Sequence, residues 1–349
     1  DPRINVGLLW LTLIPGIPYL VYLLRDVSFI WGLAAFALLP VIYTIGKRAL
    51  HDVRIVGLDK RAVFISGCDS GFGNLLALKC ARQGMPVFAG CMTEKGAEAL
   101  RVAAAGLPGP MDTLIMNVTS SESVAAAAKY LDQATEKYGG LHGVVNNAGI
   151  LGATYLDDFL SVEQYKEVAE VNTFGVIRVT QALKHLVKKT RGRIVTISSA
   201  AARVGNLGWG PYTTSKFAVS GYCEVVRQEL RFFGVSLHIL EPGVFRTPMA
   251  DAGNIEARFV EMWNRAKASA KQEYGEEYYR EFRKRQSEDI DFFGSTHLDF
   301  VVDAYFHALT ARFPQLRYQL GKDCHYFYIP MSYMPTGMRD AIFTLIELV

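Results

Sequence analysis

Charged residues are scarce in this chain. Only 20% of its 349 residues are Asp, Glu, Lys or Arg, against roughly 25% in typical soluble domains. The formal net charge is +3, which is too small to indicate a nucleic-acid partner. The 31 Gly and 13 Pro residues follow no period, which excludes a collagen-like or low-complexity chain. Because half of the residues are hydrophobic, the chain can bury enough apolar surface to fold.

Cysteines are also few. The five thiols are odd in number, and none stands in a CxxC pair: Cys68, Cys80, Cys91, Cys223 and Cys324. This pattern excludes a disulfide scaffold and a structural zinc site. We therefore predict buried free thiols and no metal.

Two uncharged apolar runs occupy residues 6–24 and 27–46, and each is close to the roughly 20 residues that span a bilayer as a helix. Residues 1–50 are predicted to be a membrane anchor, either as two spans or as one span with an interfacial segment. Two buried soluble helices are the alternative. A cleaved signal sequence is disfavoured because Arg3 alone supplies a basic leader. Basic residues after the second run favour a cytoplasmic main domain.

The remainder, residues 58–349, alternates short apolar runs with helical stretches. This alternation indicates βαβ units and a doubly wound parallel sheet with helices on both faces. The expected strands are Ala62–Ser66, Pro86–Cys91, Thr113–Val118, Gly143–Asn146, Arg193–Ser198 and Val235–Glu241. Residues 250–299 are charged and aromatic, are predicted to be helical, and would cover the carboxyl ends of the strands as a substrate lid. Residues 325–349 form an apolar C-terminal segment.

A glycine-rich loop follows the first expected strand and precedes a helix. Gly67 permits a tight turn, Gly71 lets the backbone approach a pyrophosphate, and Gly73 lets the helix pack closely. The helix would then direct its positive end at the phosphates. This context, strand before and helix after, predicts a dinucleotide site.

The end of the second strand bears on the choice of dinucleotide. Cys91 and Met92 stand there, so neither an acidic partner for a ribose hydroxyl nor a basic partner for a 2′-phosphate is present. Asp69 and Glu94 would repel a phosphate. The sequence therefore favours NAD over NADP.

Tyr212 and Lys216 are four residues apart in an expected helix, so their side chains share one face. A phenol has a pKa near ~10 and is a poor base at neutral pH. A neighbouring cation favours the phenolate, so we expect Lys216 to lower the pKa of Tyr212. Ser199 follows the fifth strand at the same sheet edge and could hold a substrate oxygen.

The combined motifs resemble the short-chain dehydrogenase/reductase family over about residues 61–349. They are Gly67xxxGly71xGly73, Asn146-Asn147-Ala148-Gly149, Asn172, Ser199, Tyr212xxxLys216 and Pro242-Gly243. The resemblance implies a Rossmann-type fold and catalysis by Asn172, Ser199, Tyr212 and Lys216. It implies cofactor contacts from Gly67, Asp69, Ser70, Gly71, Phe72, Gly73, Cys91, Asn117, Val118, Asn146, Ala148, Gly149, Tyr212, Lys216, Pro242, Gly243 and Thr247.

Within that family, each residue has an implied role. Tyr212 resembles the acid/base and Lys216 the residue that tunes it and binds the nicotinamide ribose, while Ser199 orients the substrate oxygen. Asn172 resembles an asparagine that supports a proton-relay water. Asn146 and Ala148 would line the cofactor channel. The residues expected to border the nicotinamide carboxamide are Pro242, Gly243 and Thr247.

Two positions depart from the family pattern. Ser66 replaces a usual Thr, and its hydroxyl can still make the hydrogen bond of the turn. Asn117 replaces an Asp that commonly meets the adenine, and its amide can donate or accept. An amide rather than a carboxylate is therefore expected to meet the adenine.

The segments GCDSGFG, FAGCMTEKGAEAL and GKDCHYFYIPMSYMP are similar to the branch of microsomal retinol and 3α/17β-hydroxysteroid dehydrogenases, with 3-hydroxybutyrate dehydrogenase as a near relative. This resemblance implies a lipophilic alcohol as substrate and an endoplasmic reticulum membrane, with a mitochondrial membrane as the alternative. A hydroxy acid held by Arg203 or Arg246 is the second hypothesis. The third is a non-catalytic, membrane-anchored nucleotide-binding protein. The sequence leaves open whether the protein forms a homo-oligomer.

Overall fold

The computed structural model describes residues 36, 38–39, 41–42, 45–46 and 50–348. The chain divides into two compact units, residues 1–56 with 310–314, and residues 57–309 with 315–349. Within the smaller unit, Ile55 N donates to Thr310 O and Arg312 N donates to Val53 O, both at 2.7 Å. The predicted run 6–24 and most of 27–46 lie outside the described residues. In the part that is described, no helix has both the length and the apolarity needed to cross a membrane.

The larger unit is built on a seven-stranded sheet with the order β3-β2-β1-β4-β5-β6-β7, and every pairing in it is parallel. The strands are β1 Val63–Ser66, β2 Val87–Cys91, β3 Met111–Ile115, β4 Gly143–Asn146, β5 Arg193–Ile197, β6 Ser236–Pro242 and β7 Arg317–Leu320. The predicted parallel sheet is thus confirmed. The order reverses between β1 and β4, which leaves a crevice beyond their carboxyl ends.

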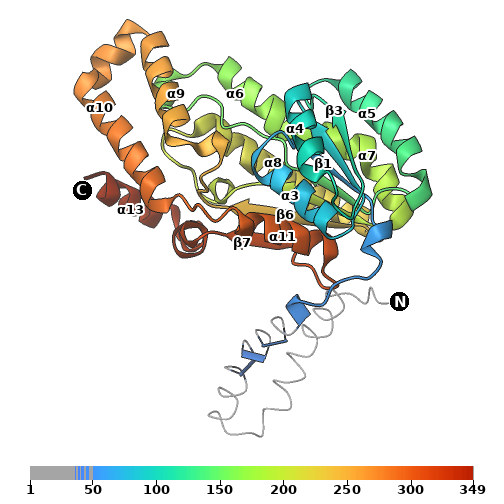
Figure 1. The fold of residues 1–349 in the computed structure, drawn as a ribbon. Helices are drawn as coiled ribbons and strands as arrows, with labels where there is room; N and C mark the ends of the chain where they lie inside the picture. The colour runs from blue at the N-terminus through green and yellow to red at the C-terminus, as the bar shows by residue number, and fades with distance from the viewer. Residues whose placement is uncertain (1–35, 37, 40, 43–44, 47–49, 349) are drawn as a thin grey trace, which may run out of the picture. The chain divides into compact units, whose positions relative to one another are not determined.

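Helices cover both faces of the sheet (Figure 1). Their bounds are α3 Gly71–Arg82, α4 Glu94–Ala104, α5 Ser121–Ala134, α6 Val162–Ala169, α7 Val176–Thr190, α8 Gly210–Arg231, α9 Ala252–Arg265, α10 Ala268–Phe293, α11 Asp299–Thr310, α12 Ile329–Ser332 and α13 Thr336–Leu348. Two π-helical segments, η5 Glu170–Gly175 and η8 Cys324–Tyr328, interrupt them.

Two apolar cores lie on opposite faces of the sheet because successive strand residues point to opposite sides. In β1, Val63 and Ile65 pack with α3, α4 and α11, whereas Phe64 packs with α5, α7 and α8. All four β1 residues are buried, as expected for a strand covered on both sides. This double burial fixes the position of the glycine loop that follows β1.

Two strands differ clearly from the prediction, and the others agree with it to within one residue at each end. β3 begins at Met111 and ends at Ile115 instead of spanning Thr113–Val118. Its earlier end has a local reason, because the Asn117 side chain accepts from Thr119 N at 3.0 Å and forms a turn there. β7 was not predicted, since its sequence RYQL lacks an apolar run. It adds to the edge of the sheet beside β6, with Ile239 paired to Arg317. Residues 250–299 are largely helical, as predicted, and form α9 and α10.

Candidate active site

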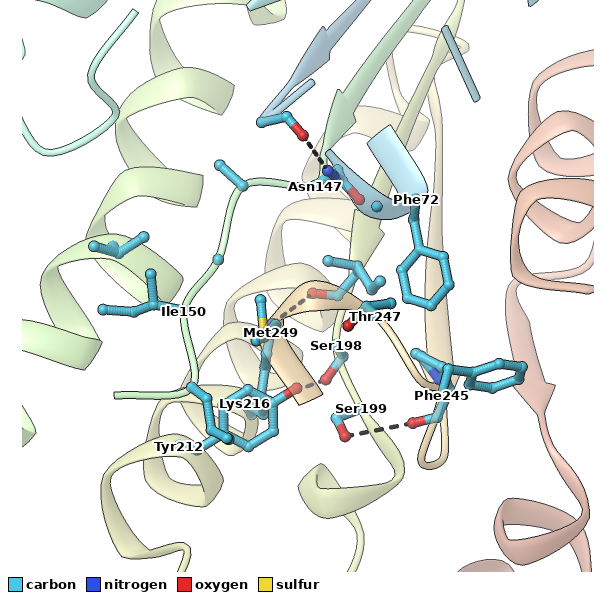
Figure 2. Close-up of a pocket in the computed structure, with 18 of the residues that line it drawn as sticks. Phe72, Asn147, Ile150, Ser198, Ser199, Tyr212, Lys216, Phe245, Thr247 and Met249 are labelled. Carbon is cyan, nitrogen blue, oxygen red and sulfur yellow. Dashed lines mark hydrogen bonds between the residues drawn. The ribbon is translucent and has the colours of Figure 1, made fainter. Parts of the chain in front are cut away.

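A cavity of about 630 Å³ lies at the carboxyl ends of β1, β4 and β5 (Figure 2). Most residues predicted for the site line it, namely Gly67, Asp69, Ser70, Gly71, Phe72, Asn117, Val118, Ala148, Gly149, Ser199, Tyr212, Lys216, Pro242, Gly243 and Thr247. With Met92 and Thr93 after β2, segments from six strand ends converge on one cavity. Gly73, Cys91, Asn146 and Asn172 do not line it.

The turn after β1 is locked against the segment after β4. Gly67 has a φ of 72°, and a Cβ there would collide with the backbone of Ala148. The hydroxyl of Ser66 accepts from Asn147 N at 3.1 Å and from Ala148 N at 3.2 Å. Serine thus makes the hydrogen bonds that the turn needs, as predicted for this departure from the family pattern.

The start of α3 is suited to an anion. Ser70 precedes the helix but makes no side-chain capping hydrogen bond, and the first turn carries no acidic residue. The first N–H groups of a helix lack partners inside it, and the helix dipole makes this end positive. Since Ser70, Gly71 and Phe72 line the cavity, this end can hold a phosphate.

Three residues predicted to contact the cofactor lie behind the cavity wall. At Gly73 a Cβ would collide with the side chain of Asn147, so this glycine permits close packing of α3. Cys91 is fully buried at the end of β2. Asn146 is also buried, and its Nδ2 donates to Thr180 Oγ1 at 2.9 Å and Thr196 Oγ1 at 3.2 Å. Asn146 therefore lies behind the wall of the cavity, and its predicted contact with the cofactor stays a prediction.

The neighbouring Asn147 lies in the wall itself. Its Nδ2 donates to Ser66 O at 3.1 Å and to Gly67 O at 2.9 Å, and its Oδ1 accepts from Tyr305 Oη at 3.1 Å. Asn146 is the last residue of β4 and Asn147 follows it. Their side chains thus have different surroundings, and only that of Asn147 adjoins the glycine loop and lines the cavity.

Asp69 holds the loop after β2. Its carboxylate accepts from Met92 N at 2.7 Å and Thr93 N at 3.0 Å, and the Thr93 hydroxyl adds a third bond at 2.8 Å. The carboxylate is therefore fixed beside the cavity wall formed by Met92 and Thr93. The negative charge of this carboxylate raises the free-energy cost of binding an anion, such as a phosphate group, next to it.

Tyr212 and Lys216 project from the first turns of α8, and Ser199 follows β5 (Figure 2). Lys216 Nζ lies 5.4 Å from the centre of the Tyr212 ring and donates to Ile197 O at 3.3 Å. Ser199 Oγ donates to Pro242 O at 3.4 Å. A phenol, an ammonium group and a hydroxyl are thus brought to the same end of the cavity.

The protonation equilibria differ from the expectation. Burial raises the pKa of Tyr212 to about 12, and a hydrogen bond with Ser199 offsets part of that shift. Burial also lowers the pKa of Lys216 to about 8. Desolvation disfavours the charged form of each group, and Lys216 is not among the causes that shift the pKa of Tyr212. The pKa of Tyr212 is thus raised, opposite to the direction expected from Lys216 alone.

Asn172 positions the cavity wall rather than lining it. It lies buried in the π-helix η5, a type of distortion common at functional sites. Its Oδ1 accepts from Ile150 N at 2.8 Å, and its Nδ2 donates to Ile150 O at 2.9 Å and Ser215 Oγ at 3.0 Å. It thereby ties the segment after β4 to the helix that carries Tyr212 and Lys216.

An apolar wall borders Tyr212. It is formed by Ile150, Leu151, Trp209, Pro248 and Met249. The aromatic residues of 250–299, the predicted substrate lid, do not line the cavity. Phe259 and Phe282 pack with Tyr155 in a third apolar core, against which Trp209 and Met249 of the cavity wall also pack. The residues that form the apolar wall were not among those predicted from the sequence to lie in the site.

Comparison with known proteins agrees with this architecture. The sequence model of the family described as short chain dehydrogenase matches residues 61–257. Retinol dehydrogenase 16 of Rattus norvegicus is 40% identical, over 85% of this chain and 92% of its own. The 3beta-hydroxysteroid dehydrogenase dhs-16 of Caenorhabditis elegans is 39% identical, over 87% and 80%. The 17-beta-hydroxysteroid dehydrogenase type 6 of Homo sapiens is 40% identical, over 82% and 89%.

Solved structures share the fold. Levodione reductase superposes with a TM-score of 0.62 at 20% identity, covering 77% of this chain and 99% of that one. The chain therefore belongs to the short chain dehydrogenase family, and it is an NAD(P)-dependent alcohol dehydrogenase or reductase. Its similarity to retinol and hydroxysteroid dehydrogenases confirms the branch predicted from the sequence.

Proposed function

We propose that this protein interconverts a lipophilic alcohol, a retinol or a hydroxysteroid, and its carbonyl compound, with Tyr212 as acid/base. The observation that carries the proposal is the convergence of Tyr212, Lys216 and Ser199 with the free start of α3 on one cavity that has an apolar wall. Hydride transfer needs chiefly this kind of positioning from the protein. The names of the relatives agree with such substrates.

The proposed residues divide the work as follows. A bound nicotinamide supplies the hydride acceptor or donor. Ser199 Oγ donates a hydrogen bond to the substrate oxygen. During oxidation Tyr212 Oη takes the hydroxyl proton, and during reduction it returns that proton to the carbonyl oxygen. The positive charge of Lys216 stabilises the phenolate that forms, while the apolar wall excludes water and strengthens this interaction.

The arginines that supported a hydroxy-acid substrate are paired elsewhere. Such a substrate needs a free cation for its carboxylate, and the two candidates were Arg203 and Arg246. Arg203 instead binds both carboxylate oxygens of Glu241, each at 3.0 Å. Arg246 pairs with Asp291 at 3.0 Å. Neither lines the cavity. The non-catalytic alternative also weakens, because the phenol, ammonium and hydroxyl groups meet at the cavity.

A panel of substrates tests the proposal. The full chain in detergent micelles is given NAD with all-trans-retinol, a hydroxysteroid or 3-hydroxybutyrate, and NADH is followed by absorbance. We expect turnover of a lipophilic alcohol and none of the hydroxy acid. Turnover of 3-hydroxybutyrate alone, or of no alcohol with either NAD or NADP, would contradict the proposal.

We further propose NAD as the preferred cofactor, because the fixed carboxylate of Asp69 disfavours a 2′-phosphate. Replacing Asp69 by Asn keeps an acceptor for the backbone N–H groups but removes the charge. The kcat/KM ratio of NAD to NADP should then fall about tenfold, since the lost repulsion corresponds to roughly 1.4 kcal/mol. Steady-state kinetics with both cofactors measure the ratio.

Glu94 provides a matched control, since its side chain is 80% exposed on the next helix. Water and salt screen an exposed charge, so Glu94→Gln should change the ratio less than about twofold. Equal effects of the two substitutions would mean that Asp69 has no specific part in cofactor choice.

The proposed place of the protein is a membrane, the endoplasmic reticulum or alternatively the mitochondrion. The support is the pair of uncharged runs at 6–24 and 27–46, which match the length of a bilayer span. A lipophilic alcohol also concentrates in the bilayer, so anchoring would raise its local supply.

A further inference from the structure

Two polar side chains face the cavity without a part in the proposed chemistry or cofactor binding. Asn206 lies between Ser199 and Tyr212 in the sequence, and Tyr328 is the last residue of η8. Asn206 Nδ2 donates to Tyr328 Oη at 3.1 Å. Two segments that are 122 residues apart therefore meet in one polar pair on the cavity wall.

The pair keeps hydrogen-bonding capacity for a ligand. In their mutual bond the Tyr328 oxygen accepts, so the phenol O–H remains a donor, and Asn206 Oδ1 remains an acceptor. Among the described residues, neither side chain makes another hydrogen bond. Burial raises the pKa of Tyr328, so the phenol keeps its proton at neutral pH. One donor and one acceptor suit a hydroxyl or a carbonyl oxygen.

The apolar surroundings of Asn206 and Tyr328 make their free hydrogen-bonding groups selective between substrates. The substrate wall is otherwise apolar, with Ile150, Leu151, Trp209 and Met249. A hydrocarbon that covered the pair would strip water from both polar groups and return no hydrogen bond, which costs free energy. A ligand that places an oxygen there avoids this cost. The same wall therefore discriminates between two lipophilic alcohols of similar size.

We propose that Asn206 and Tyr328 bind a second oxygen of the substrate, distinct from the oxygen at the reacting carbon. The preferred substrate is then an alcohol of the hydroxysteroid type that carries another hydroxyl or ketone. Retinol has only its single hydroxyl, so it offers no second oxygen to Asn206 and Tyr328. This inference rests on the proposed function, and it narrows the substrate class of the same site.

The test compares androsterone with the matching androstanol that lacks the ring-D ketone, and adds all-trans-retinol. The kcat/KM of each is measured with NAD for the wild type, Asn206→Leu and Tyr328→Phe. We expect the wild type to favour androsterone over the androstanol about tenfold, the value of one or two neutral hydrogen bonds. In both variants the ratio should fall to between about one and three, because the loss is confined to the oxygenated substrate.

Leu207→Ala is the matched control, because Leu207 adjoins Asn206 but is 48% exposed and outside the cavity wall. It should keep the wild-type ratio. A wild-type ratio near one, a preference for retinol, or an equal loss on both steroids in the two variants would overturn the inference. Absence of turnover with all three alcohols would instead contradict the proposed function.

Discussion

Replacing Tyr212 by Phe should lower kcat/KM for the alcohol about 10³-fold, the typical contribution of a positioned general acid or base. The substitution removes one oxygen and leaves the ring in the wall beside Trp209, whose ring centre is 6.1 Å away. Cofactor affinity should change less than about tenfold, because the loss of one neutral hydrogen bond costs about 1 kcal/mol. Stopped-flow or steady-state formation of NADH measures the first quantity, and titration of protein fluorescence with NAD measures the second.

Tyr222→Phe serves as the control for this prediction. Tyr222 lies in the same helix, α8, packs against the core that α8 shares with α5 and α7, and does not line the cavity. It should keep wild-type turnover. Comparable activity of the Tyr212 and Tyr222 variants would refute the assignment of the acid/base.

The pH profile gives an independent check of the same residue. Because burial raises the pKa of Tyr212 to about 12, the phenolate is a minor form at neutral pH. Its fraction grows as the pH rises, so oxidation of the alcohol should accelerate with pH up to about pH 8, where Lys216 begins to lose its charge, whereas reduction needs the protonated phenol and should not accelerate. Tyr212→Phe should abolish this opposite dependence.

The juxtaposition of Tyr212 and Lys216, the proposed acid/base and its neighbour, could be predicted because it is local. Tyr212 and Lys216 are one helical turn apart, so the helix alone sets their relation. The strand positions were similarly accessible, since burial on both faces leaves continuous apolar runs in β1 and β5. Motifs that one element determines can be recognised without the tertiary structure.

Relations between distant segments could not be predicted. The two arginines offered as carboxylate ligands have partners that the sequence does not reveal, Glu241 for Arg203 and Asp291 for Arg246. Residues 250–299 were predicted to be a substrate lid, but their aromatic residues Phe259 and Phe282 are buried against Tyr155 and do not line the cavity. Both cases depend on packing between elements, which composition and periodicity do not encode.

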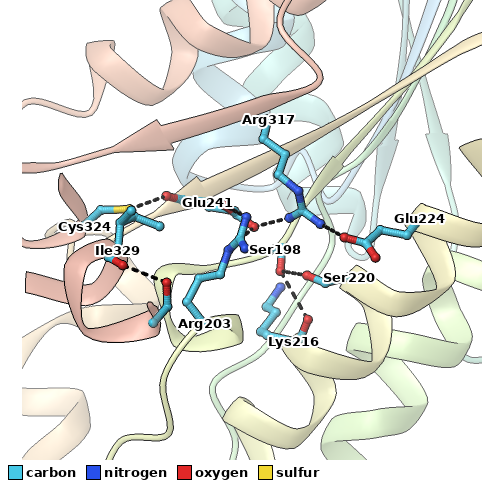
Figure 3. A network of polar contacts seen from close by, with 10 residues as sticks. Ser198, Arg203, Lys216, Ser220, Glu224, Glu241, Arg317, Cys324 and Ile329 are labelled. Carbon is cyan, nitrogen blue, oxygen red and sulfur yellow. Dashed lines mark hydrogen bonds and ion pairs between the residues drawn. The ribbon is translucent and has the colours of Figure 1, made fainter. Parts of the chain in front are cut away.

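The partners of Arg203 form part of a charged cluster beside the site (Figure 3). Glu241 is fully buried at the end of β6. Arg203 binds both of its carboxylate oxygens at 3.0 Å, and Arg317 binds one of them. Arg317 also pairs with Glu224 of α8. Glu241 precedes Pro242, whose carbonyl accepts from Ser199, so the cluster fixes the strand end that supports the proposed catalytic hydroxyl.

Replacing Glu241 by Ala should destabilise the protein strongly. It removes the counter-charge from two guanidinium groups that are only 25% and 20% exposed. Breaking such a buried ion pair costs about 3–5 kcal/mol, which for a domain of this size corresponds to a fall in Tm of about 10 °C. Circular dichroism of the full chain in detergent micelles, scanned at one fixed rate, measures the change.

Glu224→Ala is the matched control, because it removes a carboxylate from the same cluster whose side chain is 50% exposed. Water can replace that partner, and the cost should stay near about 0–1 kcal/mol, a fall in Tm below about 4 °C. A clear difference between the two variants locates the stabilisation in the buried carboxylate of Glu241. Equal falls in Tm for the two variants would show that Arg203 and Arg317 tolerate the loss of the Glu241 carboxylate. In that case the cluster does not hold the end of β6 against Ser199.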